Sequence, residues 1–149
     1  MIYIKFKYNL IKELKMAQML LRSPEHFRNL RLVSWPNART FWRIVTSGGL
    51  IRYFKRSEFE ISNFLSEKLA KIGSKLQGDF TCYLHFIGPE GRYNPERREI
   101  QANCSFGFVN FLETLWHELL HLEYYNPELS EDENEVIVGK IEEKYPFEP

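Results

Sequence analysis

The chain has few cysteines, no net charge and no long apolar run. Two cysteines among 149 residues, Cys82 and Cys104, are too few for a disulfide framework, so we expect them to be reduced. Because 20 acidic residues balance 20 basic ones, net charge does not point to nucleic acid as a partner. Lysines at positions 5, 7, 12 and 15 interrupt the apolar N-terminal stretch, so we expect neither a signal peptide nor a membrane span. These absences favour a soluble cytoplasmic protein.

The charges that are present are unevenly placed. Residues 1–56 are rich in lysine and arginine, whereas residues 113–149 are rich in glutamate. The two regions could pair within the fold or between two copies of the chain, which leaves a homodimer open. With 44% apolar residues, a chain of this length can bury a core, and we expect a single domain over residues 1–149.

Hydrophobic periodicity and capping signals predict the order of the elements. Alternating apolar residues indicate strands, and a 3.6-residue period indicates helices. Ser57 with Glu60, and Ser130 with Glu133, have the capping-box spacing that begins a helix. The expected helices cover about residues 9–22, 24–32, 38–45, 58–76, 108–123 and 131–145, and the expected strands about residues 1–7, 80–87, 92–93 and 98–104.

The string His117-Glu118-Leu119-Leu120-His121 within the helix 108–123 has the H-E-x-x-H spacing, which indicates zinc chemistry. At 100° per residue, His117 and His121 lie about 40° apart on one helix face. Both imidazoles can therefore reach one Zn²⁺, and Glu118 is close enough to bond a water on that metal. The alternative is a core helix with two hydrogen-bonded histidines. A buried, unpaired Glu118 would then cost on the order of several kcal/mol.

This H-E-x-x-H helix, with strands before it and a glutamate-bearing helix after it, resembles the zincin metallopeptidases. Within them the chain is similar to the gluzincins, whose third zinc ligand is a glutamate on the following helix, and its small size resembles the minigluzincins. The stretch G-R-Y-N-P-E-R-R-E-I before the helix also looks like the strand region beside the substrate in small zincin-like domains. The resemblance covers about residues 80–145.

The resemblance implies an α+β, zincin-like fold. A small mixed or antiparallel sheet would pack on the H-E-x-x-H helix and on the C-terminal glutamate-bearing helix. Residues 79–149 would form the catalytic core, and residues 1–78 a mostly helical N-terminal part. Residues 1–56 match no family pattern.

The third zinc ligand has three candidates in the last helix, Glu131, Glu133 and Glu135. Glu133 fits the family spacing of a ligand glutamate three residues before a small or apolar residue. It also borders the apolar stripe of that helix, about 80° from its centre, whereas Glu135 lies about 120° away. We therefore expect Glu133 to be the ligand, although its place in the capping box competes with that role. Ile137 stands where the family pattern has aspartate.

Other side chains near the motif have weaker assignments. Glu113, four residues before His117, could orient that imidazole or simply face solvent. Tyr124, Tyr125 and Tyr145 could donate to an oxyanion, but tyrosines in an aromatic-rich chain usually serve packing.

The function implied is a zinc-dependent metallopeptidase that acts on a peptide or protein. Zinc would activate a water, and Glu118 would take the proton and pass it to the leaving amine. The strand 98–104 would align the substrate by edge pairing. The enzyme could be latent, with the N-terminal helices or the C-terminal tail over the site.

Two other interpretations remain open. A zincin-like regulatory or binding protein would recognise or clip one partner through residues 1–76, without general protease activity. A purely structural zinc site would have its fourth position closed by a further ligand, such as His85 or Cys104.

Overall fold

The computed structural model of the chain describes residues 1–15, 49–86, 90–104 and 106–148. The helices expected at 24–32 and 38–45 lie outside these residues. Of the helix expected at 9–22, the described part is helical over residues 10–15.

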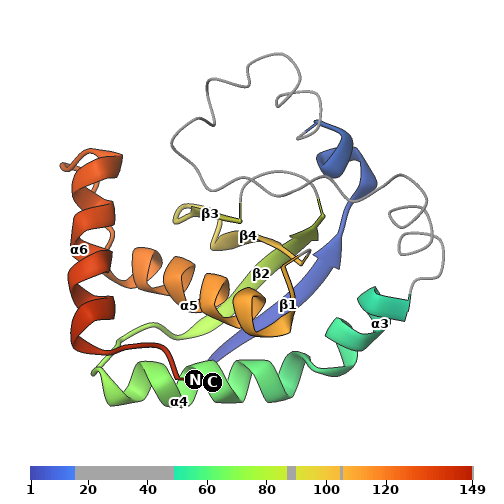
Figure 1. The fold of residues 1–149 in the computed structure, drawn as a ribbon, viewed down its shortest axis with the longest axis horizontal. Coiled ribbons are helices and arrows are strands. Elements are labelled where there is room, and N and C mark those ends of the chain that lie inside the picture. Colours follow the sequence, from blue (N-terminus) through green and yellow to red (C-terminus); the bar gives the residue numbers. More distant parts are fainter. Residues whose placement is uncertain (16–48, 87–89, 105, 149) are drawn as a thin grey trace.

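The fold is α+β, as the sequence predicts (Figure 1). Most expected elements are confirmed to within a few residues. The helix expected at 58–76 ends at Lys71, and the helix Gly49–Arg56 has no counterpart among the expected helices. In chain order the labelled elements are β1 (Ile2–Tyr8), α3 (Gly49–Arg56), α4 (Glu58–Lys71), β2 (Gly78–His85), β3 (Gly91–Asn94), β4 (Glu99–Asn103), α5 (Phe108–Tyr124) and α6 (Glu131–Lys144).

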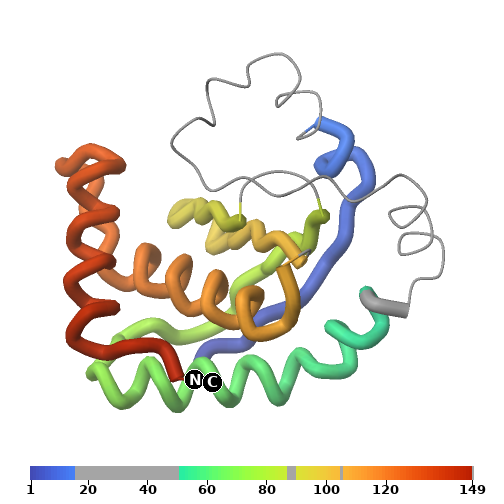
Figure 2. The backbone as a smooth tube through the Cα atoms, viewed as in Figure 1, coloured from blue at the N-terminus to red at the C-terminus, as the bar shows by residue number. Residues whose placement is uncertain are grey.

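The four strands form one mixed sheet in the order β1-β2-β4-β3. Strands β1, β2 and β4 run parallel to one another, and β3 pairs antiparallel with β4. The tube in Figure 2 shows β1 and β2 side by side although about 70 residues separate them in the chain. The prediction that the strand 98–104 forms a substrate-binding edge is wrong, because β2 and β3 flank it on both sides. Among the strands that the structure describes, β3 forms the edge on that side.

The opposite edge of the sheet, β1, is covered by side chains of α4. Four helical residues rise about 6 Å and two strand residues about 6.6 Å, so polar groups spaced by four on a helix can follow alternate amides of a strand. The bonds run from Ile2 N to Ser66 Oγ at 3.1 Å, from Ile4 N to Ser62 Oγ at 2.8 Å and from Phe6 N to Glu58 Oε1 at 3.4 Å. This edge therefore cannot pair with another strand.

The hydrophobic core lies between one face of the sheet and the helices α4 and α5. Alternate residues of each strand point into it, and α5 lies across this face in Figure 1. The rings of Phe54 and Phe111 pack at a tilt of 55° with centroids 4.6 Å apart, and both contact Phe6 of β1. Cys82 and Cys104 are free thiols. Of the helices described, none has the length and apolarity to cross a bilayer.

Replacing Ser62 by alanine tests the α4–β1 ladder. Ser62 is fully buried, so Ser62→Ala leaves the Ile4 amide without its acceptor and should lower the free energy of unfolding by about 1–3 kcal/mol. Denaturant unfolding measures this change. Asn63→Ala, at the exposed neighbouring position, controls for the gain in helix propensity and should not destabilise the protein. Equal stabilities of the two variants would contradict the ladder's contribution.

Candidate metal centre

The helix α5 has one side in the core and turns its two motif histidines toward α6. Its fully buried residues include Leu115 and Leu119, which pack against the sheet. His117 and His121 are one turn apart, and their rings meet edge-on with centroids 4.8 Å apart. Burying the apolar stripe therefore fixes the direction in which both imidazoles point.

Glu135 of α6 completes a triangle of ligand atoms with these histidines. Its two carboxylate oxygens lie 2.9 Å from His117 Nε2 and 2.7 Å from His121 Nε2. The two Nε2 atoms are 3.1 Å apart. Ligand atoms about 2.0–2.1 Å from a tetrahedral zinc ion are separated by roughly 3.3 Å, close to these distances. These three residues are the group in the described chain that could hold a metal ion.

The expectation that Glu133 is the third ligand is corrected to Glu135. Glu133 instead completes the capping box, where its carboxylate accepts a hydrogen bond from the Ser130 hydroxyl. The buried face of α6 is formed by Asn134 and Val138. The apolar stripe read from the sequence left out Asn134, a polar residue. From the centre of the observed face, Glu135 lies about 80° away on the side of the histidines and Glu133 about 120° away on the other side.

Glu142 of α6 orients His117 through the second ring nitrogen. The carboxylate of Glu142 contacts His117 Nδ1, which leaves Nε2 directed at Glu135. A carboxylate at this nitrogen fixes the tautomer and makes the imidazole a better metal ligand. From the sequence, Glu113 was the residue considered for this role, with exposure to solvent as the alternative, and Glu113 is exposed. Glu142 was missed because it lies 25 residues from His117 in the chain.

The carboxylates make this site strongly attractive to positive charge. Burial opposes a charge on His117, but hydrogen bonds to Glu135 and Glu142 outweigh it and raise the pKa of His117 to about 10. The same contacts with His117 and His121 hold the pKa of Glu135 well below its usual range. A proton on His117 and a metal cation would therefore compete for the same imidazole.

Glu118 lies behind the triangle, between α5 and the start of β3. It is 5% exposed, and a Cβ atom at Gly91 would come within 2.8 Å of its Oε1. Only glycine at position 91 therefore leaves room for this carboxyl group. Burial is the main cause that raises the pKa of Glu118 to about 8. Its Oε2 atom has no hydrogen-bond partner among the described residues. A buried carboxyl group with a pKa near neutrality suits proton transfer.

Tyr93 of β3 packs against His121, one of the two motif histidines. Its ring stacks on His121 at a centroid distance of 4.5 Å and an interplanar angle of 9°. Burial, followed by the charge of Glu118, raises the pKa of Tyr93 to about 12, so its hydroxyl stays protonated at neutral pH. Sequence reasoning considered Tyr124, Tyr125 and Tyr145 instead, because they are near the motif in the chain. Of these, Tyr125 contacts Tyr93 edge-on at 6.1 Å.

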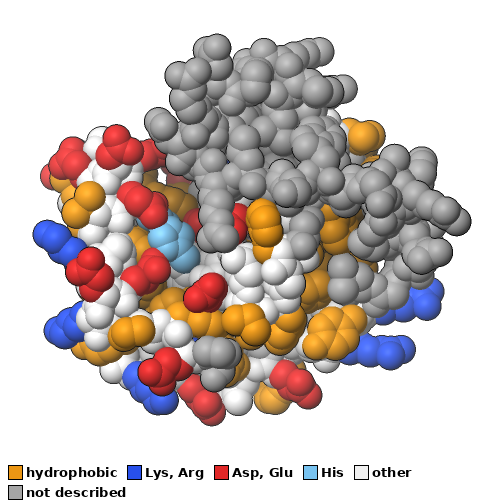
Figure 3. Space-filling view, viewed as in Figure 1, with side chains coloured by type: hydrophobic (Ala, Val, Ile, Leu, Met, Phe, Trp, Pro, Cys, Tyr) orange, Lys and Arg blue, Asp and Glu red, His pale blue; other side chains and the backbone are white. Residues whose placement is uncertain are grey.

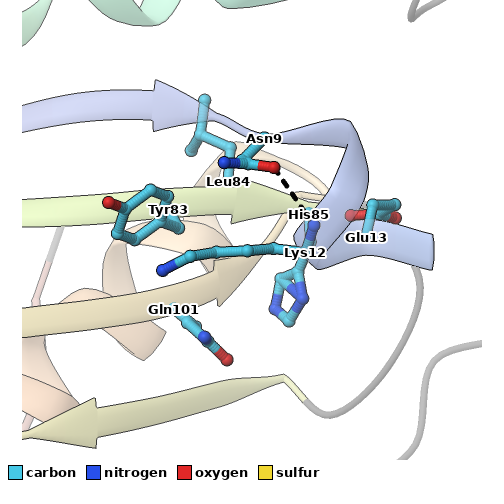
Figure 4. Close-up of a pocket in the computed structure, with 7 residues that line it drawn as sticks. All are labelled: Asn9, Lys12, Glu13, Tyr83, Leu84, His85 and Gln101. Atoms are coloured by element: carbon cyan, nitrogen blue, oxygen red, sulfur yellow. Dashed lines mark hydrogen bonds between the residues drawn. The ribbon is translucent and has the colours of Figure 1, made fainter. Parts of the chain in front are cut away.

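His85 and Cys104 do not belong to the group of converging ligand atoms. Strand alternation places the His85 side chain on the sheet face opposite α5. There it lines a small pocket beside Asn9, Lys12 and Gln101 (Figure 4). Burial lowers the pKa of His85 to about 4, so this imidazole is neutral. Within the described residues, no fourth side chain closes the metal centre.

The centre is open to solvent. The side chain of Glu135 is 57% exposed and that of His117 is 29% exposed. Figure 3 shows histidine at the surface in a recess, with carboxylates on both sides. The C-terminal tail packs elsewhere, since Phe147 contacts Phe64 of α4 at a centroid distance of 6.4 Å. The tail therefore does not cover the site.

No protein-family model matches the chain, and comparison with curated proteins and with solved structures likewise finds no match. The resemblance to zincins therefore stays an expectation from the H-E-x-x-H motif and the order of elements in the sequence.

Metal analysis of two glutamate variants tests which residue is the ligand. We expect about one zinc ion per chain in the wild type and in Glu133→Ala, whose carboxylate only caps α6. Glu135→Ala should lose the metal, because two histidines alone hold zinc weakly. Elemental analysis after gel filtration gives the metal content. Loss of zinc from Glu133→Ala with retention in Glu135→Ala would reverse the assignment.

Removing the Glu142 carboxylate should weaken metal binding without removing a ligand. Because Glu142 orients His117, Glu142→Gln should lower zinc affinity about 10- to 100-fold, measured by competition with a chromophoric chelator. Glu143→Gln, at the exposed neighbouring position, and Glu113→Gln, exposed on α5, should keep wild-type affinity. An affinity loss in Glu113→Gln alone would move the orienting role from Glu142 to Glu113.

Proposed function

We propose that this chain is a zinc-dependent metallopeptidase. The observation that carries the proposal is the triangle of His117, His121 and Glu135. Glu118 is buried on α5, the helix that carries both histidines. Two histidines and a carboxylate with an open fourth position are the ligand set of catalytic rather than structural zinc.

Each residue of the site has a separate task in peptide hydrolysis. Zinc, when bound, would polarise the substrate carbonyl and make a water acidic enough to attack at neutral pH. His117, His121 and Glu135 would hold the ion. Glu118, near its pKa at neutral pH, would accept the proton of the attacking water and deliver it to the leaving amine.

The free edge of β3 supports a peptide as the substrate. Asn103 N donates to Glu90 O, so the hydrogen-bonded pairs with β4 fall at residues 90, 92 and 94. The main-chain groups of Gly91 and Tyr93 consequently point away from β4, and the side chain of Tyr93 on this same strand stacks on His121. An extended peptide could add to this edge as a further strand. At the opposite edge, α4 prevents such pairing.

The alternative is a zincin-like regulatory protein that binds or clips one partner. It was expected to use residues 1–76 as a recognition arm. In the structure, β1 and α4 from this region are part of the sheet and the core, which argues against a separate arm in the described residues. An alternative of this kind would retain partner binding when Glu118 is replaced.

The test is Glu118→Gln, which keeps the size of the side chain and removes its basicity. The variant should bind zinc like the wild type and hydrolyse peptides at least about 100-fold more slowly, because the proton acceptor is lost. Hydrolysis of a mixed peptide library, followed by mass spectrometry, measures the rate. Glu113→Gln, on the exposed side of α5, should retain full activity.

Treatment with a chelator should abolish hydrolysis, and added zinc should restore it. Undiminished hydrolysis by Glu118→Gln would contradict the assigned base. A zinc-loaded wild type that cleaves no peptide in the library would contradict the proposed function.

A further inference from the structure

The two ligand histidines are supported in different ways. His117 has a carboxylate at Nδ1, supplied by Glu142. His121 is 3% exposed, and its Nδ1 has no hydrogen-bond partner among the described residues. A metal-binding imidazole normally has its orientation fixed by a bond at the second nitrogen. His121 therefore needs another support.

The geometry points to Tyr93 as the positioning residue of His121. Its ring fixes the orientation of the His121 imidazole, as the contact of Glu142 with Nδ1 fixes that of His117. This inference rests on the proposed metal centre. The two rings are nearly parallel, with an interplanar angle of 9° and centroids 4.5 Å apart. A stacked ring prevents the imidazole from rotating about its Cβ–Cγ bond but leaves movement within the ring plane free. His121 Nε2 can thus keep its direction toward Glu135.

The sheet holds Tyr93 firmly in this position. Tyr93 is in register with Ile100 of β4, whose side chain is fully buried, so both project to the face occupied by α5. Tyr125, at the end of α5, contacts the Tyr93 ring edge-on. The ring therefore lies between His121 and a second aromatic residue, and its orientation is determined by α5 and β3 together.

This role predicts that zinc affinity depends on the ring of Tyr93 and not on its hydroxyl group, whereas ordinary packing predicts no effect on zinc affinity. Stacking needs the ring alone, so Tyr93→Phe should bind zinc as the wild type does. Tyr93→Val keeps a residue that favours strands but removes the ring, and should weaken zinc binding about 10-fold. Tyr83→Val makes the same change on β2, on the opposite face of the sheet, and should leave zinc affinity unchanged.

Three measurements test the inference. Competition titration with Zn²⁺ gives the affinities of the four proteins, and the visible spectrum with Co²⁺ reports the ligand geometry. Separately, proton NMR of the metal-free wild type should show the His121 ring protons shifted upfield by the Tyr93 ring current. This shift should persist in Tyr93→Phe and disappear in Tyr93→Val. The wild-type NMR spectrum tests the stacking even where Tyr93→Val does not fold.

The outcomes separate this inference from the proposed function. A wild type that binds no zinc overturns the proposed function, while the NMR shift still decides whether the rings stack. Wild-type affinity and an unchanged Co²⁺ spectrum in Tyr93→Val overturn the positioning role alone. Equal weakening in Tyr93→Phe and Tyr93→Val would assign the effect to the hydroxyl group and also overturn it.

Discussion

The packing of α5 against the sheet determines where every residue of the metal centre lies. Leu115 and Leu119 are completely buried, so the helix cannot rotate without exposing them to water. This constraint turns His117 and His121 toward α6 and places Glu118 under the start of β3. The ligand geometry is consequently a by-product of hydrophobic burial, with polar contacts adjusting the final orientation of each ring.

The two edges of the sheet differ in whether their main-chain groups are already occupied. At β1, side chains of α4 occupy the amides that another strand would use. At β3, the outward main chain lies beside the metal centre. Of the two edges in the described sheet, the one open to an extended partner is therefore the one beside His117, His121 and Glu135. The glycine at position 91 belongs to the same arrangement, since any side chain there would displace Glu118.

Glu118 is a buried carboxyl group close in the chain to the two histidines, and its surroundings determine its pKa. Glu118 lies in an apolar environment that raises its pKa, and its neighbours Glu135 and Glu142 raise it further, whereas His117 lowers it. A group with this balance is costly for stability, and such costs are common at functional sites. Its position is consistent with a role in proton transfer and has no evident purpose in holding the fold together.

The sequence alone determined most of the described helices and strands, and two of the three residues of the candidate metal centre. Alternation and helical periodicity were sufficient for most strands and helices, and the four-residue spacing of His117 and His121 placed both on one face of α5, because these are local properties of the backbone. Tertiary packing decided the rest. Glu135 rather than Glu133 meets the histidines because a polar residue, Asn134, helps to define the buried face of α6. Glu142 and Tyr93 come from segments distant in the chain, and no local pattern connects them to the histidines they contact.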